Sequence, residues 1–350
     1  MRGESGRFLL RLAVFPLLMA LLPVIASAAY PGSSPVSAAV VSASRAPDRA
    51  PQPDPIGKAA SLEVNTKPVP PITTVLAPSA LEQLQGDLSK IAASSGGRVG
   101  FSLTELSGPR RTTISSGAGQ SFYAASAYKL PLLMAEAQQI ASGQASPSDS
   151  LCYDPSDQED GWFTDYDLGT CFSRQELARR AGIYSDNTAA RILVRYLGGP
   201  DVLNAYARSA GMRASALWVP NTTTPDDLAT AWVNEALGRL GGVAAQAWLY
   251  PLLTHTASEQ GIPAGVPGSV TVVHKVGTLS GSENDSAHVI SGRLTYVLSV
   301  AIDGTDEATG WTTIAQISSR IWRYESSRPD YVVVAASAEP AAPIWPDRRH

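Results

Sequence analysis

The spacing of hydrophobic and polar residues changes along this chain, and the change predicts where helices and strands lie. Alternating or β-branched runs of the strand type fall at residues 99–103, near 112–115, and at 270–276, 288–291 and 295–302. Helical spacing dominates the middle of the chain and returns near 311–322. The spacing of Ser79 and Glu82 predicts a capping box at the start of the opening helix, and Asn284-Asp285 predicts a turn between two late strands. Strands at both ends with helices between them predict an α+β fold, in which an antiparallel β-sheet is flanked by helices and joined by a helical subdomain.

Two stretches at the start of the chain differ in composition from the rest. Residues 1–28 combine three arginines, a short apolar run and an Ala-Ser-Ala tripeptide, a pattern typical of a secretory signal peptide. A retained membrane anchor is the alternative interpretation. Residues 29–78 are rich in Pro, Ala, Ser and Val, which predicts an extended linker or a spacer without a positioning role.

The remaining chain predicts one globular domain at residues 79–327, followed by a flexible tail at 328–350. The chain is 44% hydrophobic, which is enough for one substantial core. Its formal net charge is −4 and it has no basic cluster, so we do not expect a nucleic-acid partner. Its four histidines lack metal-ligand spacing, and we expect no metal or other cofactor. We expect an exported monomer that is secreted or held at the cell envelope.

A serine and a lysine three residues apart form the first candidate catalytic pair. Ser126 and Lys129 directly precede the apolar run 130–135. Residues three apart share one face of a helix, so Lys129 can reach the Ser126 hydroxyl. A serine nucleophile needs an adjacent base, and a lysine can serve only if burial or a nearby cation lowers its pKa.

A second motif, Ser185-Asp186-Asn187, lies on a short connection between two helical patterns. The spacing of Ser173 and Glu176 predicts a capping box at the start of the first helix. A Gly-Gly-Pro sequence ends the second helix. Taken alone, Ser-Asp-Asn is more often a helix cap than a catalytic element.

A third motif, Lys275-Val276-Gly277-Thr278, ends a strand rich in β-branched residues. A glycine within a strand often marks the close approach of another backbone or of a ligand. His274 lies on the opposite face from Lys275, which favours a packed histidine over a catalytic one.

In this order and at these separations, the three motifs resemble those of class A β-lactamases and penicillin-binding D,D-peptidases. The resemblance covers residues 79–325 and implies a serine hydrolase with Ser126 as nucleophile and Lys129 as its base. It further implies that Ser185 relays a proton to the leaving group and that Asp186 is structural.

The resemblance also assigns the substrate-binding residues. Asn187 would hydrogen-bond a substrate amide, and Lys275 would attract a substrate carboxylate. Gly277 and Thr278 would lie in the strand along which the substrate binds. The N–H of Thr278 and that of Ser126 would together form an oxyanion hole.

Two departures from the family pattern affect the expected activity. Val276 stands where the family usually has Thr or Ser, so it cannot donate a hydrogen bond to the substrate carboxylate. The segment 213–221 is short and contains no Glu or Asp, whereas class A β-lactamases carry a glutamate there that activates water. Without that base we expect acylation to proceed and deacylation to be slow.

Cys152 and Cys171 are an even pair in a chain that we expect to be exported, which favours a disulfide over two free thiols. Six acidic residues lie between them, and their spacing favours a solvated acidic loop over a calcium site. Three aromatic residues in the same stretch either line the substrate groove or pack locally: Trp162, Phe163 and Tyr166.

The sequence therefore predicts an exported serine hydrolase that forms an acyl-enzyme on Ser126 with β-lactams or D-Ala-D-Ala-like amides. A D,D-peptidase or transpeptidase of cell-wall peptides is the enzymatic alternative. A non-hydrolytic wall-binding protein that kept the fold is the alternative from another class.

Overall fold

The computed structural model describes residues 79–108 and 113–328. The predicted signal peptide at 1–28, the predicted linker at 29–78 and the predicted tail beyond Arg328 lie outside these residues. Within the described ranges, no helix has both the length and the apolar character needed to cross a membrane.

Five strands form one antiparallel sheet in the order β2-β1-β9-β8-β7. Their bounds are β1 (Arg98–Glu105), β2 (Thr113–Ser116), β7 (Thr271–Thr278), β8 (Ser282–Ser291) and β9 (Leu294–Asp303). These strands contain or overlap the predicted ones. Asn284 and Asp285 suggested a turn by their type, but both are buried inside β8. They are accommodated because Asn284 donates to the Tyr123 carbonyl at 2.9 Å and Asp285 accepts from the Ile262 N–H at 2.7 Å.

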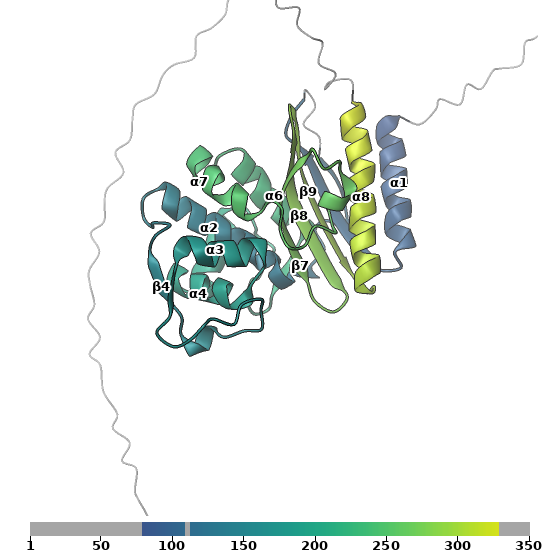
Figure 1. Ribbon diagram of the computed structural model, residues 1–350. Coiled ribbons are helices and arrows are strands. Elements are labelled where there is room, and N and C mark those ends of the chain that lie inside the picture. Colours follow the sequence, from purple (N-terminus) through teal and green to yellow (C-terminus); the bar gives the residue numbers. More distant parts are fainter. Residues whose placement is uncertain (1–78, 109–112, 329–350) are drawn as a thin grey trace, which may run out of the picture. The chain divides into compact units, whose positions relative to one another are not determined.

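Two helices, α1 (Ala80–Ser94) and α8 (Glu307–Ser327), cover one face of the sheet (Figure 1). Ser79 and Glu82 form a capping box at the start of α1, as the sequence predicts. Apolar side chains from both helices are fully buried against the strands: Leu84, Leu88, Ile314, Ile317 and Ile321. Each such side chain contributes roughly 1.5 to 3 kcal/mol when it leaves water, so this layer stabilises the sheet.

The helical part contains the predicted middle helices. They are α2 (Lys129–Ala141), α3 (Arg174–Ile183), α4 (Asn187–Leu197), α5 (Pro200–Ser209), α6 (Pro225–Ala236) and α7 (Gly242–Leu249). Ser173 caps α3, but the capping box is only half formed. The Glu176 carboxylate pairs instead with Arg179 and Arg180, each at 2.8 Å or less.

Short elements connect the helices to one another and to the sheet. Two small ladders join β3 (Phe122–Tyr123) to β6 (Thr222–Thr223) and β4 (Ser150–Cys152) to β5 (Cys171–Ser173). Single 3₁₀ turns are η1 (Ala125–Tyr128), η2 (Pro155–Asp157), η3 (Tyr250–Leu252) and η4 (Pro263–Gly265).

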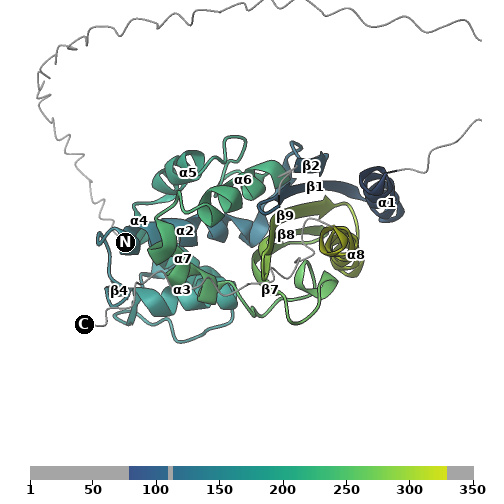
Figure 2. The ribbon, with the colours of Figure 1, turned by 90° about the horizontal axis from the view of Figure 1, so that it is seen from above.

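The sheet lies between the helical part and the α1–α8 layer, as Figure 2 shows from above. Helix α6 packs on β1, β8 and β9. The edge strand β7 packs against the turn η1, which leads into α2. The α+β prediction is therefore confirmed, and the line of contact between β7 and η1 is where all three motifs meet.

Candidate active site

Ser126 lies in the 3₁₀ turn η1, and Lys129 is the first residue of α2. The turn brings the two side chains together, with Lys129 Nζ 2.9 Å from Ser126 Oγ. Nζ also donates to the Ser185 carbonyl at 2.5 Å and to Asn187 Oδ1 at 2.7 Å. A neutral amine has two N–H bonds and one lone pair, so these two acceptors leave the lone pair free to face the serine hydroxyl.

The environment of Lys129 favours that neutral form. The side chain is fully buried. Burial is the main cause that holds the pKa of Lys129 well below its usual range, and the positive charge of Lys275 adds to the effect. Lys129 therefore meets the condition for a lysine base, which is a pKa lowered by burial or by a nearby cation.

Lys275 and Lys129 are connected through Ser185. Lys275 Nζ donates to Ser185 Oγ at 2.9 Å and to the Val276 carbonyl at 2.9 Å. Burial lowers the pKa of Lys275 to about 7, against an opposing contribution from Asp285. Ser185 has a φ of 57°, in the left-handed region. A non-glycine residue is uncommon there, and the strain aims its hydroxyl between the two lysines.

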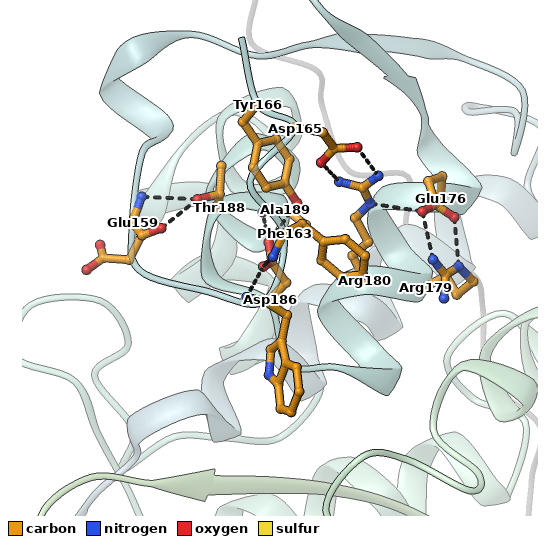
Figure 3. Close-up of polar contacts among 11 residues, drawn as sticks. Glu159, Phe163, Asp165, Tyr166, Glu176, Arg179, Arg180, Asp186, Thr188 and Ala189 are labelled. Carbon is orange, nitrogen blue, oxygen red and sulfur yellow. Dashed lines mark hydrogen bonds and ion pairs between the residues drawn. The ribbon is translucent and has the colours of Figure 1, made fainter.

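Asp186 caps α4 and also holds the neighbouring loop in place. Its carboxylate accepts from the Ala189 N–H at 2.9 Å, from the Trp162 N–H at 3.0 Å and from the Tyr166 hydroxyl at 2.7 Å. Figure 3 shows this carboxylate between α4 and the loop segment 159–166. The contacts of Asp186 are those of the structural residue that the resemblance implies.

Gly277 allows β7 to approach the turn that carries Ser126. A Cβ placed on Gly277 would lie 2.4 Å from the Ala124 carbonyl oxygen and 3.1 Å from the Ser126 nitrogen. Only glycine fits without displacing one of the two backbones. The predicted close approach is thus to another backbone, and it brings Thr278 and Ser126 to the same wall of the cleft.

Two hollows meet at Ser126, Asn187 and Thr278, which line both. The first hollow has a volume of about 540 Å³ and is also lined by Tyr128, Glu159, Arg191, Trp218 and Val219. The second has a volume of about 490 Å³ and is also lined by Trp162, Tyr184, Ser185, Ser258 and Val276. A carbonyl group held at Ser126 can therefore extend one substituent into each hollow.

The segment 213–221 forms part of the first hollow without contributing a carboxylate. Trp218 and Val219 line that hollow, and Val219 is 85% exposed. Among the described residues that line it, Glu159 is the only acid. Nothing in the local sequence marks Glu159 as a site residue, because it belongs to a different segment and only folding brings it there.

The loop between the cysteines is mostly exposed to solvent, as the sequence predicts. The Cys152–Cys171 disulfide is formed. Three of the loop's six acidic residues pair with arginines, as in the 2.7 Å contact of Asp157 with Arg195, but only Asp157 is buried and the other five are exposed. Asp165 pairs in the same way with Arg180, and Glu159 with Arg191. In the described parts of the chain, no group of three or more His, Cys, Asp or Glu side chains is placed to hold a metal ion.

The aromatic residues of this loop divide between the two roles considered. Trp162 is 66% exposed and lines the second hollow. Tyr166 is buried, and Phe163 packs edge-on against Tyr184 with ring centroids 5.3 Å apart. Only Trp162 therefore contributes to the wall of the cleft.

His274 is buried on the face of β7 away from Lys275, as predicted. Its ring bonds to the Asp285 carboxylate at 2.9 Å and to Glu259 at 3.2 Å. These carboxylates raise the pKa of His274 to about 9, against the opposite effect of burial. The network ties the segment that bears Ser258 to β7, so His274 supports the second hollow from behind.

Comparison with known proteins identifies the family. Residues 83–324 match the model of the β-lactamase enzyme family. β-Lactamase CTX-M-25 of Escherichia coli is 30% identical over 239 residues, which cover 61% of this chain and 79% of the relative. An ancestral class A β-lactamase structure is 27% identical with a TM-score of 0.64, and the match covers 69% of this chain and 99% of that one. The chain belongs to the β-lactamase enzyme family and is a serine hydrolase.

A further solved structure shares the fold at lower identity. It is a mutant of PBP-A, described as an acyl-enzyme complex with penicillin G. It is 22% identical to this chain with a TM-score of 0.67, and the match covers 72% of this chain and all of that one.

Proposed function

We propose that this protein forms an acyl-enzyme on Ser126 with β-lactams or with D-Ala-D-Ala-like amides, and that it releases the acyl group slowly. The observation that carries the proposal is the buried Lys129 amine, 2.9 Å from Ser126 Oγ and linked through Ser185 to Lys275. Relatives named as β-lactamases, and a PBP-A mutant described as a penicillin G acyl-enzyme, support it.

Acylation follows from this geometry. Lys129 removes the proton from Ser126 as Oγ attacks the substrate carbonyl carbon. The developing oxyanion accepts hydrogen bonds from the backbone N–H groups of Ser126 and Thr278. As the C–N bond breaks, the proton passes from Lys129 through the Ser185 hydroxyl to the leaving nitrogen. Lys275 lies beside that path and attracts a substrate carboxylate.

Slow deacylation follows from the segment 213–221. General-base catalysis contributes about 10²- to 10⁴-fold, and this segment has no carboxylate to activate the water that attacks the ester. Glu159 lines the same hollow, but it belongs to the loop before α3 and its carboxylate is paired with Arg191.

The missing loop carboxylate also favours a second enzymatic role. A D,D-peptidase or transpeptidase acting on cell-wall peptides uses the same acylation step, and a transpeptidase passes the acyl group to an amine instead of to water. We further propose export through residues 1–28 and action as a monomer at or outside the cell envelope. A non-hydrolytic wall-binding protein is the alternative from another class, and it differs from both enzymes in forming no covalent adduct.

Intact-protein mass spectrometry after exposure to a penicillin tests the proposal. We expect a stable adduct on the native chain and none on the Ser126→Ala variant. With a chromogenic cephalosporin we expect a stoichiometric burst followed by a slow steady rate, and Lys129→Ala should abolish the burst. No adduct with any penicillin, cephalosporin or D-Ala-D-Ala analogue would favour the wall-binding protein.

A further inference from the structure

A half-exposed ion pair lines the first hollow and takes no part in the proposed acylation. It joins Glu159, in the loop before α3, to Arg191 on α4. Their side chains are 45% and 34% exposed, so both charges face the space beside the nucleophile. Arg191 lies one helical turn beyond Asn187, the proposed contact of the substrate amide. The ion pair is therefore further along α4 than that contact.

The direction of the substrate follows from the position of Ser185, which lines the second hollow. If Ser185 delivers a proton to the leaving nitrogen, as the proposed function holds, the leaving group occupies the second hollow. The acyl chain then extends from the carbonyl carbon into the first hollow. Its far end therefore reaches Glu159 and Arg191.

The pair is held in place before any substrate arrives. The Glu159 N–H and carbonyl both bond to the Thr188 hydroxyl, at 3.0 and 2.9 Å (Figure 3). The Arg191 guanidinium lies 5.3 Å from the centroid of the Trp218 ring, which in turn packs edge-on against Tyr128. A preorganised site of this kind loses little conformational entropy when a ligand binds.

Both partners keep free hydrogen-bonding capacity. In the described part of the chain, the guanidinium of Arg191 forms one hydrogen bond, from Nη1 to Glu159 Oε2. In the same part of the chain, Nε and Nη2 of Arg191 form no hydrogen bond, and neither does the second carboxylate oxygen of Glu159. A carboxylate can therefore bind to Arg191, and an ammonium can bind to Glu159, without breaking the existing pair.

We infer that this ion pair recognises an amino-acid head group, with an ammonium and a carboxylate on one carbon, at the end of the substrate's acyl chain. A single positive or negative charge would meet one partner of like charge, whereas a zwitterion pairs with both. The inference rests on the proposed function for its direction of binding, and it adds the class of acyl group that the enzyme prefers.

Four cephalosporins with one nucleus and different acyl side chains test this. Cephalosporin C carries an amino-acid head group, and its adipyl, 6-aminohexanoyl and hexanoyl analogues carry a carboxylate, an ammonium and no charge. We expect cephalosporin C to acylate the native chain about tenfold faster than each analogue, as charge-assisted contacts imply. Arg191→Gln and Glu159→Gln should each reduce that ratio to within about twofold.

Arg320→Gln is the matched control, because it breaks an ion pair with Asp87 on the far side of the sheet. It should leave the ratio unchanged. Equal acylation rates for all four compounds on the native chain would overturn the inference.

A binding measurement separates failure of the inference from failure of the proposed function. If no compound acylates the chain, the proposed function fails. Calorimetric binding to the Ser126→Ala variant then decides the inference alone. Tighter binding of cephalosporin C than of the hexanoyl analogue, lost in Arg191→Gln, supports the site, and equal binding overturns it.

Discussion

At the scale of single residues, burial decides the charge on the two lysines of the site. Lys129 and Lys275 are both almost completely buried, and burial is the first cause of the lowered pKa of each. The two lysines must nevertheless differ in protonation state. Lys129, the proposed base, is neutral, whereas Lys275, the proposed contact of the substrate carboxylate, is charged. Their titrations are linked through Ser185, so pH profiles will report values that belong to the pair.

The Lys275→Arg variant tests whether Lys275 acts as the charged lysine. With a pKa of about 7, Lys275 is charged below neutral pH and loses its charge above it. The rate constant for acylation by a penicillin, divided by its dissociation constant, should therefore fall as pH rises through about 7. An arginine stays charged, so the variant should keep its activity to above about pH 9. If the variant loses activity at the same high pH as the native chain, Lys275 does not bind the substrate carboxylate.

Glu283 is a second buried ionisable residue, and it affects stability rather than catalysis. Both of its carboxylate oxygens are buried without a hydrogen-bond partner in the described chain. Burial, followed by repulsion from Glu307 and Asp306, raises the pKa of Glu283 to about 7. The folded protein therefore keeps a proton that the unfolded chain releases above about pH 4.5.

Because of that retained proton, the free energy of unfolding should fall as pH rises from about 4.5 to 7. Glu283→Gln cannot ionise. Between pH 5 and pH 8 the free energy of unfolding should fall in both proteins, and the fall should be about 1 to 3 kcal/mol smaller in the variant than in the native chain. Urea unfolding at the two pH values measures the difference. Equal losses in both proteins would contradict the raised pKa.

At the scale of elements, Asp186 couples the start of α4 to the loop that forms part of both hollows. It accepts three hydrogen bonds from the segment 162–166 in addition to its helix-capping bond. The same loop reaches Asn187 through the Asp160 carbonyl, at 2.7 Å. The position of the loop therefore depends on a helix cap.

Asp186→Ala should reduce the free energy of unfolding by about 2 to 3 kcal/mol, because it leaves several buried donors without a partner. Hydrogen exchange at the Trp162 amide should accelerate. Asp306→Ala, which removes the cap of α8, is the control. It should destabilise the protein less than Asp186→Ala does and leave exchange in the loop unchanged. Unchanged exchange in Asp186→Ala would mean that the other contacts of the loop hold it in place without this carboxylate.

At the scale of the whole molecule, the proposed reaction centre is assembled from the two parts of the fold. The helical part supplies Ser126, Lys129 and Ser185, and the sheet supplies Lys275 and Thr278. The segment 213–221 lies beside this junction and contributes Val219, which is exposed toward the first hollow. A carboxylate at that position would line the same hollow as Ser126.

Val219→Glu should therefore increase the steady rate of cephalosporin hydrolysis by about tenfold or more, within the range of general-base catalysis. The burst amplitude should stay the same because acylation does not use this residue. Val219→Gln has the same shape without a basic oxygen and should stay slow. Equal steady rates in the two variants would show that water activation does not limit turnover.

Short-range patterns in the sequence predicted much of the fold and the centre of the site. The three-residue spacing of Ser126 and Lys129 places both side chains on one turn. The β-branched residues before Gly277 require an extended strand. The Ser79–Glu82 spacing and the strand and helix periods are equally local, because each depends on bonds and packing within a few residues.

Tertiary structure alone decided the contacts between distant segments. Glu159 and Arg191 are 32 residues apart, and nothing in their local sequence indicates that they meet beside Ser126. Asp285 suggested a turn by its type, yet it is buried in a strand because His274 and a backbone N–H satisfy its carboxylate. Which charges face the substrate depends on how the chain returns to the cleft, and that is set by the packing of the whole domain.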